Sequence, residues 1–420
     1  MKKVFNILPL NKNLMIIITI VTIVRLISIA VSPLEISADE AQYWLWSNDL
    51  KWGYFSKPPI IAWVIFLSTS ILGVSEFSIR FFAPILHTIT AILIYKLSRD
   101  IYGDKNNIAF TSAIVWLSLP IIGVGSFLIS TDTPLMLIWT ASLLAINYAK
   151  DKKRVSMWLF AGSIAGIGML AKYASIYLPL GIMIWFLLFY KDKTYKKLKY
   201  LIFYLLGFVI FASPNLIWNL NNNFNTINHL SDNAVISTPN YSITGSISFI
   251  LSQVAVLGPI LFFVSIISIW NFWKNNHKIN WLLCFILPVF ILMIIQGFFS
   301  EANANWSATA LPGLTIFCAA YLSKYKLLSK ITISSNFIIC LIIVIISITG
   351  SLGNYPIKSD PLRKLKGWDI YASEINKLID NSESKIVLVN RRGVASPLIF
   401  YLRETDILIR VPKPINKISN

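Results

Sequence analysis

Two adjacent carboxylates, Asp39 and Glu40, come soon after the first long apolar stretch of the chain. On a helix, Asp39 would share a face with Tyr43, and Glu40 would share one with Trp44. A carboxylate beside aromatic rings at a membrane surface suits general-base work on the hydroxyl or amine of an acceptor. Solvated acids within an interfacial belt of aromatic residues would give the same pattern. The pair therefore indicates catalysis only in combination with other residues.

Two lysines are expected near the same edge of the membrane. Lys57 precedes Pro58 and Pro59, whose rings stiffen the backbone. Lys172 occupies a short turn between two apolar stretches, with no acid beside it in the sequence. A lysine at this depth is costly unless it meets an anion, and phosphate is a suitable one. A lysine that reaches out to interfacial water is the alternative for both positions.

Further polar residues begin or follow other apolar stretches at this face. Asp132 lies at the start of one stretch, where helix capping explains an aspartate equally well. Because five separate segments place acids or cations at one membrane face, we predict a shared site. Its catalytic acids are Asp39, Glu40 and Asp132, its phosphate-binding residues are Lys57 and Lys172, and its pocket residues are Tyr43, Tyr54, Glu301, Asn305 and Trp306.

Long apolar segments must position these side chains. The chain of 420 residues is 56% hydrophobic and only 13% charged, whereas soluble domains carry roughly 25% charged residues. The stretches that could cross about 30 Å of hydrocarbon are 14–32, 78–98, 108–125, 132–149, 155–171, 173–190, 200–219, 246–271, 280–299, 306–322 and 331–350. This pattern predicts an all-α, polytopic membrane protein with about eleven transmembrane helices. Residues 60–72 are short and follow two prolines, which favours an interfacial or re-entrant helix.

Charged residues sort onto the two sides of the membrane if 60–72 does not cross it. Lysines and arginines gather in the loops on the side of the N-terminus, whereas most acids lie in the opposite loops. Long loops at 33–77 and 220–245 fall on the acidic side. This positive-inside pattern places the candidate site outside the cytoplasm. It also accounts for the net charge of +18 and excludes nucleic acid as a partner in favour of membrane lipids.

The chain is predicted to have two parts. Residues 1–350 form the membrane unit, with 33–77 as its first outer catalytic loop. After residue 350 the chain becomes polar, and periodicity predicts helix, strand, helix and strand in turn over 368–379, 385–390, 395–402 and 406–411. Residues 351–420 are therefore expected to be a small α/β appendage on the outer face.

An ordered set of motifs resembles a known family. The motifs are DEAQYWLW, GYFSKPPIIAW, LGVSEFSIRFFAPI, STDTPLMLIWT, GIGMLAKYASIYLPL, EANANWSATALPGL, GWDIYASEI and NRRGVASPLIFYLR. Together they resemble the bacterial membrane glycosyltransferases of the GT-C fold that are related to protein O-mannosyltransferases and to the lipid A aminoarabinose transferase. The resemblance implies transfer of a sugar from a polyprenyl-phosphate donor in the inner membrane, with Asp39 as the principal carboxylate. It also implies that Lys57 and Lys172 meet the phosphate of the carrier.

Several alternatives stay open from the sequence. Ser56 stands where aminoarabinose transferases tend to have a carboxylate, which counts against that sugar and leaves a divalent metal undecided. The acceptor is lipid A, a polysaccharide or a protein. A flippase or other transporter of lipid-linked glycans is the rival function, and it should show ionisable residues at mid-bilayer and paired interrupted helices. A non-catalytic scaffold would leave the clustered charges unexplained.

Overall fold

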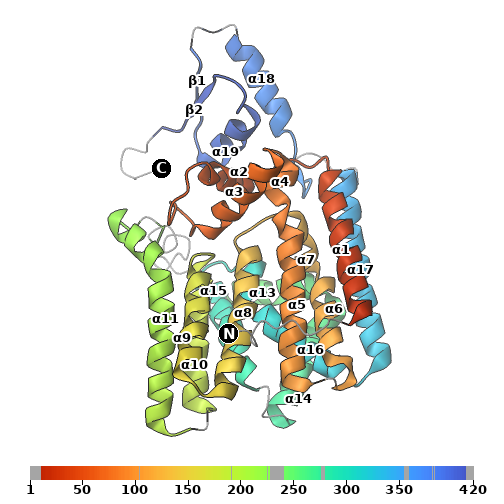
Figure 1. Cartoon of the computed structure of the whole chain (residues 1–420). Coiled ribbons are helices and arrows are strands. Elements are labelled where there is room, and N and C mark those ends of the chain that lie inside the picture. The colour runs from red at the N-terminus through yellow and green to blue at the C-terminus, as the bar shows by residue number, and fades with distance from the viewer. Residues whose placement is uncertain are drawn as a thin grey trace.

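In the computed structural model, the chain forms a bundle of long helices with a small appendage at one end (Figure 1). The structure describes residues 11–412 apart from 104, 191, 225, 228–240, 276–279, 354–358, 381 and 383. The bundle helices are α1 (Lys12–Ala30), α5 (Phe82–Tyr102), α6 (Ile108–Ser118), α7 (Pro120–Phe127), α8 (Asp132–Lys152), α9 (Val155–Met169), α10 (Tyr177–Leu188), α11 (Thr194–Asn221), α13 (Ile243–Leu257), α14 (Pro259–Asn275), α15 (Asn280–Phe299), α16 (Leu311–Leu322) and α17 (Lys326–Thr349). The predicted helical membrane fold is confirmed, while most of the predicted loop 220–245 falls outside the described residues.

The number of crossings is less sharply defined than the fold. By length and composition, five helices among the described residues could span a membrane, or seven if each of two bent pairs counts as one span. Shorter apolar helices, including α9 and α10, fill other predicted positions. About eleven spans therefore stays a prediction, and the observed order of the helices is compatible with it.

Two predicted spans are broken, which corrects the expectation of continuous helices. The stretch 108–125 bends by 57° between α6 and α7, and 246–271 bends by 109° between α13 and α14. Pro120 and Pro259 each follow a break, where a proline cannot donate to the preceding turn. Gly258 has a φ of +88°, a conformation that favours glycine.

Side chains from other helices satisfy the backbone at both breaks. Asn336 of α17 donates from Nδ2 to the Leu257 carbonyl at 2.8 Å. Arg25 of α1 is buried and donates from Nη2 to the Leu117 carbonyl at 2.7 Å. This contact supplies one partner for an arginine within a span, while its buried Nη1 atom has no acceptor among the described residues.

Close helix contacts hold the bundle together. At Gly162 of α9, an added Cβ would lie 1.9 Å from the Tyr204 carbonyl oxygen of α11, so only glycine fits there. Gly166, one turn further on, meets the Phe208 carbonyl in the same way. Such small residues at four-residue spacing let membrane helices approach closely.

A layer of short helices crosses the end of the bundle nearest the appendage (Figure 1). It consists of α2 (Ala38–Ser47), α3 (Ile60–Leu72) and α4 (Glu76–Arg80). A capping box starts α2, since Ser37 Oγ accepts from the Glu40 amide and Glu40 Oε2 accepts from the Ser37 amide. The range of α3 matches the short helix predicted at 60–72.

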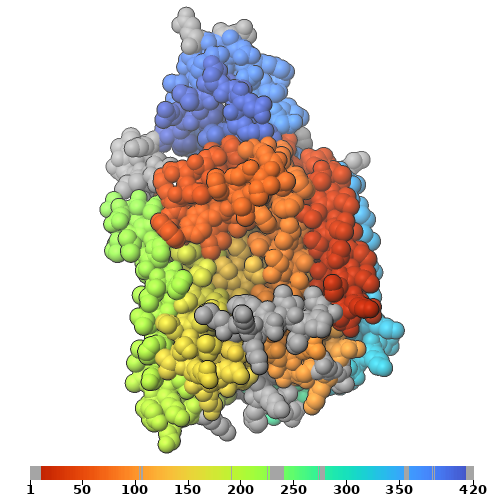
Figure 2. Space-filling view, viewed as in Figure 1, coloured from red at the N-terminus to blue at the C-terminus, as the bar shows by residue number. Residues whose placement is uncertain are grey.

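The appendage has the predicted order of elements. It contains α18 (Trp368–Asp380), β1 (Ile386–Leu388), α19 (Arg392–Tyr401) and β2 (Leu408–Arg410). The strands are parallel, with Ile386 opposite Leu408. It sits directly on the layer of short helices (Figure 2), where Phe400 of α19 packs edge-on against Trp44 of α2 at 5.0 Å between ring centroids.

Candidate active site

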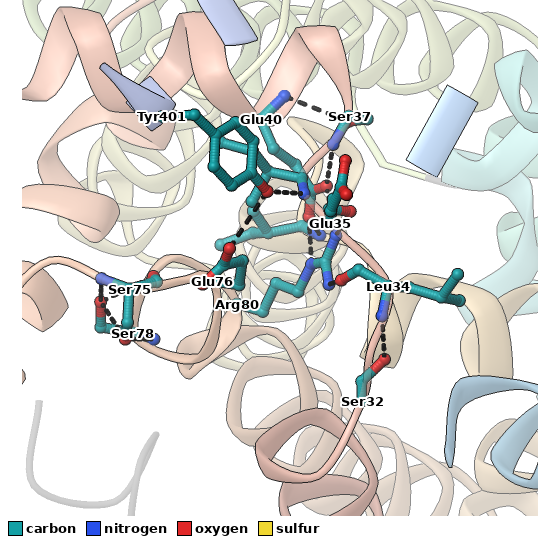
Figure 3. Close-up of polar contacts among 12 residues, drawn as sticks. Ser32, Leu34, Glu35, Ser37, Glu40, Ser75, Glu76, Ser78, Arg80 and Tyr401 are labelled. Atoms are coloured by element: carbon teal, nitrogen blue, oxygen red, sulfur yellow. Dashed lines mark hydrogen bonds and ion pairs between the residues drawn. The ribbon is translucent and has the colours of Figure 1, made fainter. Parts of the chain in front are cut away.

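A buried ion pair between Glu40 and Arg80 holds the layer of short helices in place (Figure 3). The two side chains are 1% and 0% exposed, and Arg80 donates to both carboxylate oxygens of Glu40 at 2.9 and 3.0 Å. Glu40 also accepts from the Ile129 amide, and Arg80 donates to the carbonyls of Leu34 and Glu35. With its oxygens occupied and water excluded, Glu40 is poorly placed to take a proton from a substrate.

The same region joins the first loop to the appendage. Tyr401 donates from its hydroxyl to Glu76 Oε1 at 3.1 Å and accepts from the Ile36 amide at 3.2 Å (Figure 3). Glu35 accepts from the amides of Gly367 and Trp368 at the entrance to α18. Burial raises the pKa of Glu35, and a hydrogen bond with Asp369 raises it further. These contacts fix the appendage over α2.

Three segments far apart in the sequence meet at Asp132. Lys172 Nζ lies 2.7 Å from Asp132 Oδ1, and Asn305 Nδ2 donates to Asp132 Oδ2 at 2.8 Å. Asp132 is almost fully buried, whereas the Lys172 side chain is 21% exposed. Both carboxylate oxygens are thus engaged, and the arrangement fixes the position of the Lys172 ammonium.

The loop that carries Lys57 is tied to the Lys172 turn. Ile60, the first residue of α3, donates its amide to the Leu170 carbonyl at 2.9 Å. Lys57 is half-buried, and burial lowers the pKa of its ammonium, with the positive charge of Lys172 as the next cause. The charges of Asp39 and Asp132 act on the Lys57 pKa in the opposite direction. The four charged side chains therefore share one electrostatic environment.

Asp39 differs from its neighbour Glu40 in being exposed on α2. Its negative charge contributes to the raised pKa of Tyr43, for which burial is the main cause. Tyr43 is buried one helical turn along from Asp39. An exposed carboxylate with cations nearby is free to meet an acceptor hydroxyl.

The other predicted pocket residues differ in what they contact. The Tyr54 hydroxyl donates to the carbonyls of Trp46 and Asp49 and accepts from the Lys51 amide, which closes the loop on itself. Trp306 is half-buried, and Glu301 is exposed. Only Asn305 of that segment has a direct bond to a charged residue of the site.

Two arginines at this face were not predicted as site residues. Arg80 is the partner of Glu40, and Arg392 begins α19 with its guanidinium 4.8 Å from the centroid of the Phe55 ring. The charge of Asp39 acts on the Arg392 pKa, which burial lowers. Both lie within motifs that carry the family resemblance, but motif membership by itself does not show which residues approach the acids. Within the described ranges, no group of three or more His, Cys, Asp or Glu side chains could hold a metal ion.

The sequence of the chain is similar to those of known proteins. Residues 56–218 match the family model described as dolichyl-phosphate-mannose-protein mannosyltransferase. The lipid A galacturonosyltransferase RgtD of Rhizobium johnstonii is 27% identical over 398 residues, which cover 94% of this chain and 83% of that protein. The undecaprenyl phosphate-alpha-4-amino-4-deoxy-L-arabinose arabinosyl transferase 2 of Proteus mirabilis is 26% identical over 60% of this chain and 48% of that protein.

A solved structure shows the same fold. The crystal structure of ArnT from Cupriavidus metallidurans bound to undecaprenyl phosphate superposes with a TM-score of 0.69 and 13% sequence identity, covering 94% of this chain and 85% of that one. The fold therefore belongs to the GT-C class of polytopic inner-membrane proteins. The resemblance predicted from the sequence is confirmed: the chain is similar to membrane glycosyltransferases of the protein mannosyltransferase and lipid A aminoarabinose transferase kind.

Proposed function

We propose that this protein transfers a sugar from a polyprenyl-phosphate donor to an envelope lipid of the lipid A class, at the outer face of the inner membrane. The observation that carries this proposal is that the loop of Lys57 is bonded to the turn of Lys172, through the Ile60 amide and the Leu170 carbonyl at 2.9 Å, beside an exposed Asp39. Asp132 already pairs with Lys172, so a further anion beside Lys57 would offset the second positive charge in this partly buried site. A donor phosphate would supply that anion.

In the proposed reaction, an acceptor hydroxyl oxygen attacks the anomeric carbon of the donor sugar. The bond from that carbon to the phosphate oxygen breaks, and polyprenyl phosphate leaves with the bonding electrons. Asp39 takes the hydroxyl proton as general base. Lys57 and Lys172 stabilise the charge that develops on the leaving phosphate, while Asp132 and Asn305 hold Lys172 in position. We assign Glu40 to the architecture of the site, because Arg80 occupies its carboxylate.

Helix α8 supports an outward orientation of the site. It has 21 residues, with Asp132 at one end and Lys150 and Lys152 at the other. A helix of this length extends about 30 Å, the thickness of the hydrocarbon core. Because lysines favour the cytoplasmic ends of spans, the end that carries Asp132 is assigned to the periplasm. We likewise propose residues 1–350 as the membrane unit and 351–420 as the outer appendage.

The broken helices favour a transporter of lipid-linked glycans as the second candidate. Interrupted helices commonly form the binding sites of transporters. Here, however, Arg25 and Asn336 of the chain itself occupy the freed carbonyls of α6 and α13. These contacts make the breaks more suited to shaping the bundle than to binding a moving substrate.

Reconstitution tests the two candidates directly. Proteoliposomes that contain the full chain would be supplied with a set of undecaprenyl-phosphate sugars and lipid A, and lipids would be followed by mass spectrometry. We expect lipid A to gain the mass of one sugar residue as an equal amount of undecaprenyl phosphate is released. Movement of donor between leaflets without any mass gain in an acceptor would support transport instead. A parallel comparison of envelope lipids from cells with and without the protein identifies the sugar.

A further inference from the structure

Helices α9 and α11 lie side by side, and α11 begins at the end of the bundle opposite the appendage (Figure 1). Gly162 of α9 lies against the Tyr204 carbonyl of α11, and Gly166 lies against the Phe208 carbonyl. Because both partners of this contact move one helical turn along the chain together, the two helices run parallel. Their first turns therefore lie close to each other and form one surface.

The turns that precede these two helices are joined. Tyr200 of α11 donates from its hydroxyl to the Lys153 carbonyl at 2.8 Å. The Lys153 ammonium lies 3.8 Å from the carboxylate of Asp192, in the turn before α11. The other acid of these turns, Asp151, lies 3.8 Å from the Lys150 ammonium. Both acids therefore already face a lysine.

Four further cations on this surface have no carboxylate partner among the described residues. Arg154 precedes α9 and Lys193 precedes α11, while Lys196 and Lys199 lie within the first two turns of α11. Arg154, Lys193 and Lys199 are exposed, and Lys196 is half-buried. These four residues are called the basic surface below. Such an excess of unpaired positive charge attracts anions.

Apolar side chains lie next to the basic surface. Lys197 of α11 donates to the Phe186 carbonyl at 3.2 Å, which holds the end of α10 beside the start of α11. The last two residues of α10, Leu187 and Leu188, are 81% and 68% exposed. Tyr195, in the first turn of α11, is also exposed. Cations beside exposed apolar side chains match the headgroup and the acyl chains of an anionic lipid.

The length of α9 favours a lipid over a soluble partner. The helix has 15 residues and extends about 22 Å, which is less than the roughly 30 Å of the hydrocarbon core. The bilayer thins around helices that are shorter than its hydrocarbon thickness. Lipid headgroups are therefore drawn to the level of Arg154, where they meet the cations before a soluble acidic protein can.

We propose that the basic surface binds the headgroup of an anionic phospholipid from the cytoplasmic leaflet, while the acyl chains lie along Leu187 and Leu188. Because the cations come from two adjoining turns, a lipid with two phosphates, such as cardiolipin, suits them best. This lipid is neither donor nor acceptor, since the surface follows the end of α8 away from Asp132. The inference uses the proposed orientation, in which that end of α8 faces the cytoplasm.

Titration of cardiolipin into the purified full chain tests this inference, with bound lipid measured by native mass spectrometry. A triple variant should bind cardiolipin about a hundredfold more weakly, since each basic residue at a membrane surface contributes a factor of about five. Its changes are Arg154→Gln, Lys193→Gln and Lys196→Gln. The matched control removes three exposed lysines around the start of α17 and should bind like the unaltered protein; its changes are Lys324→Gln, Lys326→Gln and Lys330→Gln.

Unchanged binding by the triple variant would overturn the inference, and so would a lack of binding by the unaltered protein. An equal loss in the control would also overturn it, because lysines anywhere on this face would then attract the lipid equally. Added salt should weaken binding, since the contacts are charged; binding that persists at high salt would contradict the role of the cations. Thermal unfolding in phosphatidylcholine nanodiscs shows whether the variants remain folded. The assay contains no donor or acceptor, so its result is independent of sugar transfer.

Discussion

Asp39 and Glu40 are neighbours in the sequence, yet they lie in two regions that differ in how far their charged groups are paired. Around Glu40, the guanidinium of Arg80 and the amides of Ser37 and Ile129 occupy both carboxylate oxygens, and Arg80 is buried against it (Figure 3). Around Asp39, the carboxylate is exposed, Lys57 and Lys172 repel each other, and Arg392 keeps a donor without an acceptor among the described residues. The region around Glu40 and Arg80, called the saturated region below, stabilises the layer of short helices. The region around Asp39, Lys57 and Lys172 is left to bind a ligand.

The strongest test of this contrast is Asp39→Asn. If Asp39 is the general base, transfer should fall by about 10²–10⁴-fold while the thermal unfolding temperature stays unchanged. Initial rates in proteoliposomes measure the effect. Asp49→Asn is the control, because Asp49 is an exposed acid of the same loop whose partner is Lys51. Near-normal turnover by Asp39→Asn would remove this carboxylate from the mechanism.

The same change one residue along should act on stability. Glu40→Gln leaves Arg80 buried without its counter-charge, which costs about 3–5 kcal/mol of folding free energy. We expect a lower unfolding temperature and less protein in the membrane. The double variant Glu40→Gln with Arg80→Met removes both charges and should recover part of the loss. If Glu40→Gln unfolds like the unaltered protein but loses turnover, the saturated region is itself catalytic.

Lys172→Ala tests a residue that has features of both regions, since Lys172 is both paired and partly exposed. Affinity for undecaprenyl phosphate should fall about tenfold, the value of one charged contact. Stability should fall less than in Glu40→Gln, because Asp132 keeps its bond from Asn305. Lys51→Ala removes an exposed lysine of the first outer loop and serves as the control. Unchanged affinity in Lys172→Ala would confine this lysine to a structural role.

The smallest expected effect concerns the contact between the appendage and the saturated region. Tyr401→Phe removes the hydroxyl that bonds to Glu76 and to the Ile36 amide. A loss of about 1 kcal/mol is expected for such a bond, measured as a small decrease in unfolding temperature. Turnover should be nearly unchanged. A large loss of undecaprenyl phosphate binding would instead show that docking of the appendage is easily disturbed.

Several elements were predictable because their causes are local. The prolines at 58 and 59 and the short apolar stretch after them predicted a separate helix, and α3 has the predicted range. The periodicity of polar and apolar residues likewise predicted the order of helices and strands in the appendage. The breaks after α6 and α13 were missed, because apolar composition continues through Pro120 and through Gly258 and Pro259.

The site was predictable only in part. The acids and lysines were expected to come from several segments of one face. In the structure Asp132 pairs with Lys172, and the charges of Lys172, Asp39 and Asp132 all act on Lys57. The sequence could not distinguish Asp39 from Glu40, since a helix turns adjacent side chains about 100° apart and only the surroundings decide which one is buried. It also did not indicate that Arg392 reaches the loop of Lys57.

By itself, the sequence determined the membrane setting and the residue types available in the polar loops, and it predicted the side on which those loops lie. Hydropathy and charge asymmetry act on each segment separately, so they can be read along the chain. The tertiary structure decided which charges are neutralised, because Glu40 and Arg80 are 40 positions apart in the sequence, and so are Asp132 and Lys172. Ion pairs depend on distances of a few ångströms and on burial, and packing sets both.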